Sequence, residues 1–257
     1  MYREIGDGYV KTECHNGVTT IEFHHPQSNS LPGLLLEAMT HEVHGAGNDR
    51  DTRVIVLRSG GERAFCAGAS FDELLAIGTP EQGLHFFSGF AHLINAMRKC
   101  PKFIIVRIQG KCVGGGVGIA AAADYAIATA GADVKLSELA IGIGPFVVGP
   151  AVERKIGVAN FGSLAIDATR WRDSEWAKRK GLYSELHGNA TEMDESIQRL
   201  AGNLAHSNPE AMALLKQHLW KGTEHWDQLL PERAEMSGRL VLSPFSRQAI
   251  SALRPKK

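Results

Sequence analysis

The sequence has few cysteines, no long apolar run and no excess of charge of either sign. Its four cysteines, Cys14, Cys66, Cys100 and Cys112, lack the paired spacing of a metal site, so we expect reduced thiols. No apolar run approaches the roughly 20 residues of a membrane-spanning helix. The polar N-terminal residues lack the apolar core of a signal peptide. These absences predict a cytoplasmic protein that neither crosses nor binds a membrane.

The balance of charge excludes another class of partner. Basic and acidic residues both number 28, so the formal net charge is zero, whereas a nucleic-acid binder usually shows a basic excess. The eleven histidines are scattered, and no H-E-x-x-H or comparable ligand set occurs. We therefore expect no nucleic-acid partner and no metal site.

The first part of the chain alternates between predicted strands and predicted helices, which favours an α/β fold. Asn16-Gly17 between two β-rich runs is a strong hairpin signal. Thr79-Pro80 reads as the start of a helix that must end before Pro101. The predicted strands cover residues 9–14, 18–23, 53–57, 103–108 and 125–128, and the other predicted helix covers 34–43.

The composition changes near Thr191 and becomes helical to the end. Thr191-x-x-Asp194 resembles a capping box, Asn208-Pro209 opens a second helix, and Pro231 is predicted in the first turn of a third, over 231–242. We expect an α/β core over residues 1–190 and a C-terminal helical region over 191–257. Its apolar stripes could pack on that core or mediate oligomerisation.

The most informative stretch runs from Lys111 to Asp124. Three glycines, Gly114 to Gly116, follow an apolar strand and open an alanine-rich segment, which predicts a strand, a tight turn and a helix N-terminus. Such an N-terminus offers unpaired backbone N–H groups and partial positive charge. It suits an anion, or an oxygen that becomes anionic during a reaction.

A second loop of small residues, from Ala64 to Leu74, follows the strand at 53–57. Two strands that each end in such a loop could aim two backbone N–H groups at one point, as the stabilisation of a thioester enolate requires. Either loop alone could simply allow tight packing, so the interpretation depends on the pair.

On these residues the chain resembles the crotonase superfamily, the enoyl-CoA hydratases and isomerases. The matching segments are Ala64-Phe-Cys-Ala-Gly-Ala69, Gly110-Lys-Cys-Val-Gly-Gly-Gly116, Ala123-Asp-Tyr-Ala-Ile-Ala128 and Val134 to Pro145, in order along essentially the whole chain. The resemblance implies a spiral of β-β-α turns with a C-terminal helical region that forms a homotrimer or hexamer. It implies an acyl-CoA substrate, of which coenzyme A is a part, and no separate cofactor.

The resemblance also assigns site residues. The two N–H groups of the oxyanion hole belong to Ala69 and Gly115, and Glu138 is the acid/base. The apolar neighbours of Glu138 predict a raised pKa, which suits proton transfer near neutral pH. The candidate substrate-binding residues are Cys66, Ala67, Gly68, Ser137 and Phe146, and candidate contacts to the phosphates of coenzyme A are Lys111, Arg254, Lys256 and Lys257. Cys66 could equally be a buried small filler.

One position departs from the family pattern. Gly118 stands where hydratases usually carry a second glutamate. One carboxyl is enough to shuttle a proton between two carbons, so the departure favours double-bond isomerisation and leaves hydration open. The expected function is an enoyl-CoA hydratase/isomerase of fatty acid metabolism. The alternatives are a non-catalytic acyl-CoA-binding subunit and a hydrolase, decarboxylase or carbon–carbon lyase of the same superfamily.

Overall fold

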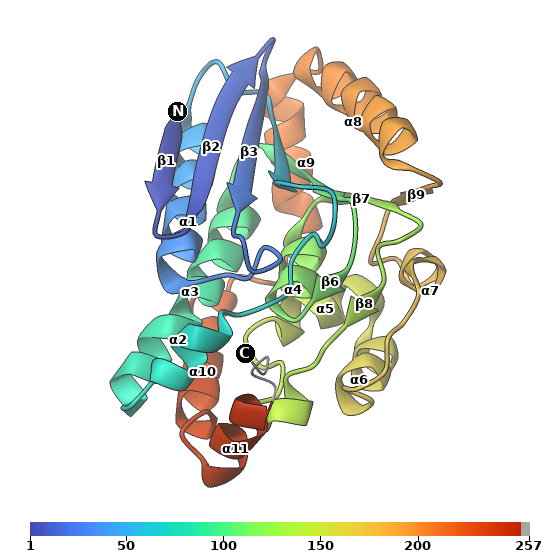
Figure 1. Ribbon diagram of the computed structural model, residues 1–257. Coiled ribbons are helices and arrows are strands. Elements are labelled where there is room, and N and C mark those ends of the chain that lie inside the picture. The colour runs from blue at the N-terminus through green and yellow to red at the C-terminus, as the bar shows by residue number, and fades with distance from the viewer. Residues whose placement is uncertain (253–257) are drawn as a thin grey trace.

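The computed structural model describes residues 1–252, and its centre is a sheet of seven strands (Figure 1). The first three strands pair antiparallel, and the remaining pairs are parallel. In sheet order the strands are β1 (Tyr2–Ile5), β2 (Gly8–His15), β3 (Val18–His24), β4 (Val54–Ser59), β5 (Phe103–Ile108), β7 (Tyr125–Thr129) and β9 (Glu185–His187). The predicted strands are all present, whereas β1 and β9 were not predicted.

The hairpin of β2 and β3 confirms the Asn-Gly prediction. Asn16 and Gly17 have φ angles of 51° and 81°, and His15 pairs with Val18 across the turn. A two-residue turn with both central residues at positive φ matches the twist of the flanking strands.

A second, smaller sheet has two parallel strands. Its strands are β6 (Cys112–Val113) and β8 (Val134–Lys135). Isolated parallel bridges from Leu31 to Ala69 and from Cys66 to Cys112 extend this layer along the chain. Each winding of the chain therefore supplies a long strand, a short extended segment and a helix, which confirms the spiral of β-β-α turns.

Helices cover both faces of the large sheet (Figure 1). They are α1 (Gly33–Asn48), α2 (Phe71–Ala76), α3 (Pro80–Lys99), α4 (Gly115–Ala122), the 3₁₀ turn η1 (Leu139–Ile141), α5 (Gly149–Ile156), α6 (Val158–Ile166), α7 (Ser174–Arg179), α8 (Ala190–Ala205), α9 (Pro209–Leu219), α10 (Trp226–Leu240) and α11 (Pro244–Ala252). The predicted start of α3 is confirmed by a capping box, because Thr79 accepts from the Gln82 N–H and the Gln82 side chain accepts from the Thr79 N–H.

The alternation of side chains along the central strands divides the core in two. Ile55 and Leu57 of β4 face the large cluster that includes α1 and α3, whereas Val54 and Val56 face α8. Parallel strands buried on both faces explain why these runs are apolar throughout rather than alternating with polar residues.

The predicted capping box at Thr191 is wrong, because α8 begins at Ala190. Asn189 is the N-cap: its side-chain oxygen accepts from the Glu192 N–H at 3.0 Å, and its amide donates to Glu192 Oε1 at 2.9 Å. Asp194, the last residue of the predicted box, instead pairs with Arg107 of β5. Helix α8 therefore starts after Asn189, the stronger of the two caps, and from there it reaches its contact with the sheet.

The predicted start of the third C-terminal helix at Pro231 is also wrong. Helix α10 begins at Trp226, and Pro231 lies inside it. The earlier turn is held by tertiary contacts: Trp226 packs edge-on against Trp220 with ring centroids 5.9 Å apart, and Asp227 pairs with Arg98 of α3. These contacts offset the backbone hydrogen bond that proline cannot donate.

The described part of the C-terminal region packs against its own core. Helix α8 lies on one face of the sheet, and α10 lies along α3, where a Cβ on Gly83 would come within 2.5 Å of the Gly238 carbonyl. In Figure 1, α10 and α11 lie at the end of the molecule opposite α8, beside α2 and η1. No helix within residues 1–252 has the length and apolar character needed to cross a bilayer.

Candidate active site

The two small-residue loops lie side by side at the edge of the large sheet. Phe65 N–H donates to the Lys111 carbonyl at 3.0 Å, and Val113 N–H donates to the Cys66 carbonyl at 2.9 Å. These bonds flank the isolated parallel bridge between Cys66 and Cys112 of β6. Backbone pairing, rather than side-chain contact, therefore brings together two segments that are far apart in the sequence.

Close approach explains two of the glycines. Gly114 has a φ of +53°, and a Cβ there would lie 3.8 Å from the Gly68 Cα and 3.1 Å from Glu138 Oε1. A Cβ on Gly115 would lie 2.2 Å from Cε1 of Phe90, whose ring packs on the start of α4. Both positions therefore require a residue without a side chain.

Two backbone donors belong to residues that line one cavity. Ala69 and Gly115 both line it, and no hydrogen bond from either N–H is found within residues 1–252. Gly115 is the first residue of α4, so its N–H has no partner inside the helix. A pair of free N–H groups in one cavity is the arrangement that stabilises a developing oxyanion.

The cavity is small and has apolar walls. Its volume is about 60 Å³. The predicted site residues among its walls are Ala67, Gly68, Ala69, Gly115, Ser137, Glu138 and Phe146. Val147 and Val148, which directly follow Phe146, also line it. Side chains that the sequence did not assign complete it: Phe71, Leu74, Phe87, Phe90, Ile141 and Ser237. The last of these belongs to α10, so the C-terminal region contributes to the wall.

Glu138 is the only ionisable side chain among the described residues that line this cavity. The residue is partly exposed to the cavity, but its Oε2 atom is buried and has no hydrogen-bond partner within the described chain. Its backbone is well held, since its carbonyl accepts from the N–H groups of Ile141 and Ile143. Burial raises the pKa of the carboxyl from 4.5 to about 7, where it can take or give a proton at neutral pH.

The position of the missing second glutamate is closed. Gly118 is buried in α4, and a Cβ there would lie 2.5 Å from Cγ1 and 2.8 Å from Cβ of Val148. A larger residue at 118 needs Val148 to move. The site is therefore built around one carboxyl by its packing as well as by its sequence.

Cys66 does not line the cavity. It is fully buried behind the loop, where its Sγ accepts from the Gly68 N–H at 3.3 Å, and burial raises the pKa of its thiol to about 12. It therefore acts as a small filler under the loop. Lys111 lies over the ring of Trp171, with its Nζ 4.8 Å from the ring centroid. The other candidate phosphate contacts, Arg254, Lys256 and Lys257, lie outside the described residues.

A buried polar network supports the first loop and was missed from the sequence. Asn29 donates to the carbonyl oxygens of Gly60 and Ala64, both at 2.9 Å, and accepts from the His25 N–H. Gln109 donates to Ser59 Oγ at 2.8 Å and to the Ala64 carbonyl at 3.3 Å. Asn29 and Gln109 thus hold the turn between β4 and the loop from opposite sides.

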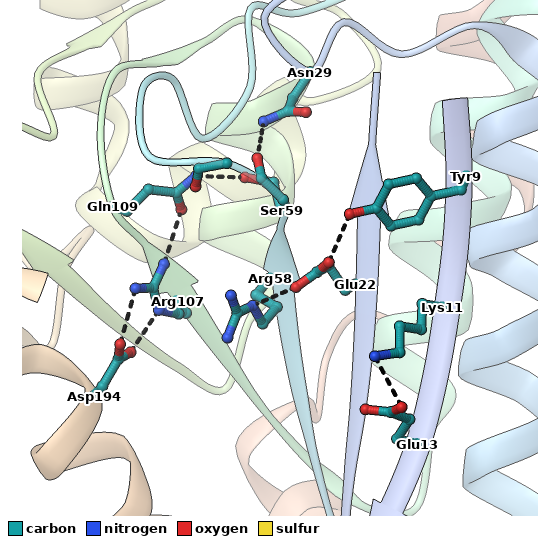
Figure 2. A network of polar contacts seen from close by, with 12 residues as sticks. Tyr9, Lys11, Glu13, Glu22, Asn29, Arg58, Ser59, Arg107, Gln109 and Asp194 are labelled. Atoms are coloured by element: carbon teal, nitrogen blue, oxygen red, sulfur yellow. Dashed lines mark hydrogen bonds and ion pairs between the residues drawn. The ribbon is translucent and has the colours of Figure 1, made fainter. Parts of the chain in front are cut away.

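Figure 2 shows how this network continues to the C-terminal region. Arg107 of β5 donates to Gln109 Oε1 at 3.4 Å and makes a two-pronged contact with Asp194 of α8, at 2.5 and 3.0 Å. A polar residue directly after a buried strand, such as Gln109, was the available signal in the sequence. Its partners Ser59 and Ala64 could not be read there, because they lie in a distant part of the sequence.

Within residues 1–252, no group of three or more His, Cys, Asp or Glu side chains is placed to hold a metal ion. The chemistry that the cavity offers from its own residues is thus two backbone donors and one carboxyl with a pKa near neutrality.

Comparison with known proteins gives a consistent result. The family model described as enoyl-CoA hydratase/isomerase matches residues 13–251. The chain is 30% identical over 223 residues to the peroxisomal Delta(3,5)-Delta(2,4)-dienoyl-CoA isomerase of Arabidopsis thaliana, a match that covers 80% of this chain and 78% of the relative. It is 32% identical over 200 residues to the mitochondrial methylglutaconyl-CoA hydratase of Rattus norvegicus, covering 76% and 63%. It is 25% identical over 251 residues to the short-chain-enoyl-CoA hydratase of Clostridium acetobutylicum, covering 96% and 95%.

A solved structure shows the same fold. The enoyl-CoA hydratase of Bacillus halodurans superposes with a TM-score of 0.88 at 24% identity, covering 95% of this chain and 99% of that one. The chain therefore belongs to the enoyl-CoA hydratase/isomerase family, within the crotonase superfamily of enzymes.

Proposed function

We propose that this member of the enoyl-CoA hydratase/isomerase family moves a proton on an enoyl-CoA, with Glu138 as the single acid/base. The thioester oxygen is held by the N–H groups of Ala69 and Gly115. One observation carries the proposal. Among residues 1–252, a single cavity combines two backbone donors without a hydrogen bond and one unpartnered carboxyl, and no second ionisable side chain lines it.

In the proposed steps the Glu138 carboxyl both takes and returns the proton, so no second acid or base is required. The Glu138 carboxylate takes a proton from C2 of a 3-enoyl-CoA, and the electron pair of that C–H bond moves onto the thioester as a conjugated enolate. The two N–H groups stabilise the enolate oxygen, by about 3–4 kcal/mol for each well-placed donor. Glu138 then returns the proton to C4, and the double bond lies between C2 and C3.

Hydration is the second candidate. It is favoured by the printed names of two relatives, a methylglutaconyl-CoA hydratase and a short-chain-enoyl-CoA hydratase. In this reaction Glu138 would activate a water molecule and return its proton to the substrate. Isomerisation stands first because Val148 fills the space beside Gly118 where a second carboxylate would be placed.

The test is a set of 2-enoyl- and 3-enoyl-CoAs incubated in D₂O, with the products identified by mass. We expect a 3-enoyl-CoA to become its 2-enoyl isomer with little deuterium at the transferred position, because one carboxyl moves the same proton. Rapid hydration without isomerisation would assign the protein to the hydratases. Tight binding without turnover would support a non-catalytic subunit. Release of free coenzyme A, release of CO₂ or cleavage of a carbon–carbon bond would support one of the other superfamily reactions.

We also propose assembly as a homotrimer or hexamer. Helix α9 leaves Leu214, Leu215 and Leu219 between 49% and 58% exposed, an apolar strip that its own core does not cover. Light scattering at micromolar concentration should give the mass of three or six chains, and a monomer would refute the proposal. A cytoplasmic location is a further prediction, which cell fractionation tests.

A further inference from the structure

A second cavity adjoins the catalytic one. Its volume is about 340 Å³, against about 60 Å³ for the cavity that holds Glu138. The segment Gly144-Pro145-Phe146 lines both. Glu138 and its neighbour Leu139 face opposite sides, because Glu138 lines only the small cavity and Leu139 only the large one. The two spaces thus share one thin wall.

The catalytic cavity by itself is too small for a long acyl group. An engineered apolar cavity of about 150 Å³ binds a benzene molecule, and one water occupies about 30 Å³ in the liquid. The catalytic cavity of about 60 Å³ therefore has room for an acyl group of only a few carbon atoms.

Phe146 is the side chain that fills the shared wall. Its ring packs directly on Gly144, where a Cβ would lie 2.7 Å from Cε2 of the ring. The segment depends on two glycines at positive φ, Gly142 at +78° and Gly144 at +85°. The Phe146 N–H donates to the Gly144 carbonyl at 2.9 Å, which folds the segment tightly. The ring itself has no polar group, so only packing holds it in place.

The second cavity is suited to hydrocarbon. Leu139, Phe161, Ala165 and Ile166 supply most of its wall, whereas Glu153 and Arg233 are its only charged lining residues in the described chain. Ile166 is 77% exposed and Leu139 is 49% exposed, so the far side of the cavity meets solvent. An apolar channel open at one end and closed at the other by a phenyl ring could accommodate the tail of an acyl chain.

We propose that Phe146 is the partition that limits the length of the acyl group, and that the cavity lined by Leu139, Phe161 and Ile166 receives the tail when the partition is removed. The inference rests on the proposed function and deepens it: the wild-type substrate is a short-chain enoyl-CoA, and the specificity residue is Phe146. The side chain acts by excluding atoms and takes no part in proton transfer.

The experiment compares kcat/KM for four-carbon and eight-carbon enoyl-CoAs in the wild type and in Phe146→Ala. The wild type should prefer the four-carbon substrate. Each methylene that gains access to an apolar wall improves binding about fourfold. We therefore expect Phe146→Ala to raise the eight-carbon to four-carbon ratio by roughly 10-fold or more, and Phe146→Leu to give an intermediate ratio.

Two further variants locate the effect. Gly162 lines the second cavity, and a Cβ there meets no atom within 4 Å, so Gly162→Leu starts its side chain in open space and is chosen to occupy the cavity. Adding Gly162→Leu to Phe146→Ala should return the ratio toward the wild-type value. Phe103→Ala removes the same side chain on the opposite side of the sheet, beside α8, and should leave the ratio unchanged. An unchanged ratio in Phe146→Ala and Phe146→Leu, or a gain that survives Gly162→Leu, would overturn the proposal.

Calorimetric titration with saturated butyryl-CoA and octanoyl-CoA separates this inference from the proposed function. If the wild type binds neither ligand, the proposed function fails. If it binds butyryl-CoA but Phe146→Ala gains no affinity for octanoyl-CoA, Phe146 does not limit the length of the acyl group, and the proposed function stands. A gain for octanoyl-CoA alone supports both.

Discussion

Two enclosed carboxylates, Asp124 and Glu138, have opposite surroundings. Asp124 follows α4, and its oxygens accept from Trp220 Nε1 at 2.9 Å and from the Ile104 N–H at 2.8 Å, and pair with Lys216 Nζ at 2.7 Å. Glu138 Oε2 has no partner within residues 1–252. The first carboxylate is fully satisfied and ties α9 to the sheet. The second is left unsatisfied in a cavity.

The difference shows how one chemical group serves two purposes. A buried carboxylate with three partners is held in place by them, so it can tie separate elements together. A buried carboxyl without partners has its charged form destabilised, which raises its pKa toward neutrality. The fold thus supplies partners to the carboxylate that anchors α9 and withholds them from Glu138, where we propose that a proton moves.

The largest expected effect is on catalysis. Glu138→Gln keeps the shape of the side chain and removes the base, so turnover should fall by roughly 10²-fold or more. Binding of a saturated acyl-CoA should persist, because the two backbone donors are unchanged. Steady-state kinetics and calorimetry measure the two quantities. Turnover near the wild-type level would exclude Glu138 as the proton carrier.

The matching change at Asp124 should act on stability. Asp124→Ala leaves Lys216, which is 2% exposed, as a buried charge without its partner. Loss of one member of a buried ion pair costs about 3–5 kcal/mol. Urea unfolding should show this loss, and adding Lys216→Met should recover much of it. If the single variant unfolds at the wild-type urea concentration, the anchoring role is wrong.

The pH dependence of stability distinguishes the two carboxylates further. The pKa of Glu138 in the folded protein is raised from 4.5 to about 7, so the folded state favours the protonated form. Its contribution is fully present below pH 4.5 and is lost as the pH rises through about 7. The total is at most about 3 kcal/mol, since the residue is partly exposed.

Glu138→Gln should therefore be more stable than the wild type at pH 8–9, and this advantage should shrink as the pH falls to 5. Urea unfolding of both proteins across this range measures the difference. A constant difference would mean that the pKa of Glu138 is not raised.

Local signals predicted the parts of the fold that local chemistry determines. The Asn16-Gly17 turn, the Thr79 cap and the three glycines at the start of α4 were all located from neighbouring residues. The start of α8 was missed because Asn189 and Thr191 are both good caps, and the choice between them depends on the contact of α8 with the sheet. The start of α10 was missed for the same reason, because contacts with α3 extend the helix from Pro231 back to Trp226.

The site shows the same division. The sequence indicated both loops and Glu138, and the structure brings them to one cavity. It could not indicate Leu74, Phe90 or Ser237, because apolar and small residues on helices look alike whether they line a cavity or fill a core. It could not place Cys66 either, since small residues of one loop face both the cavity and the packed side behind it.

A third carboxylate, introduced beside Glu138, gives the smallest and most specific effect. Gly118→Glu alone should lose about 1–3 kcal/mol of stability, because its Cβ would meet Val148 at 2.5 Å. It should gain no hydration activity, since the new side chain has no room. The double change Gly118→Glu with Val148→Ala removes the obstructing methyl groups and should recover part of the stability.

If the missing second carboxylate is what disfavours hydration, the double variant should hydrate a short 2-enoyl-CoA faster than Val148→Ala, its matched control, as measured by loss of the enoyl absorbance. Equal rates in the two variants would show that hydration depends on something other than a second carboxylate at this position. The comparison of Asp124 with Glu138 would then still explain the proton carrier, but not the choice between isomerisation and hydration.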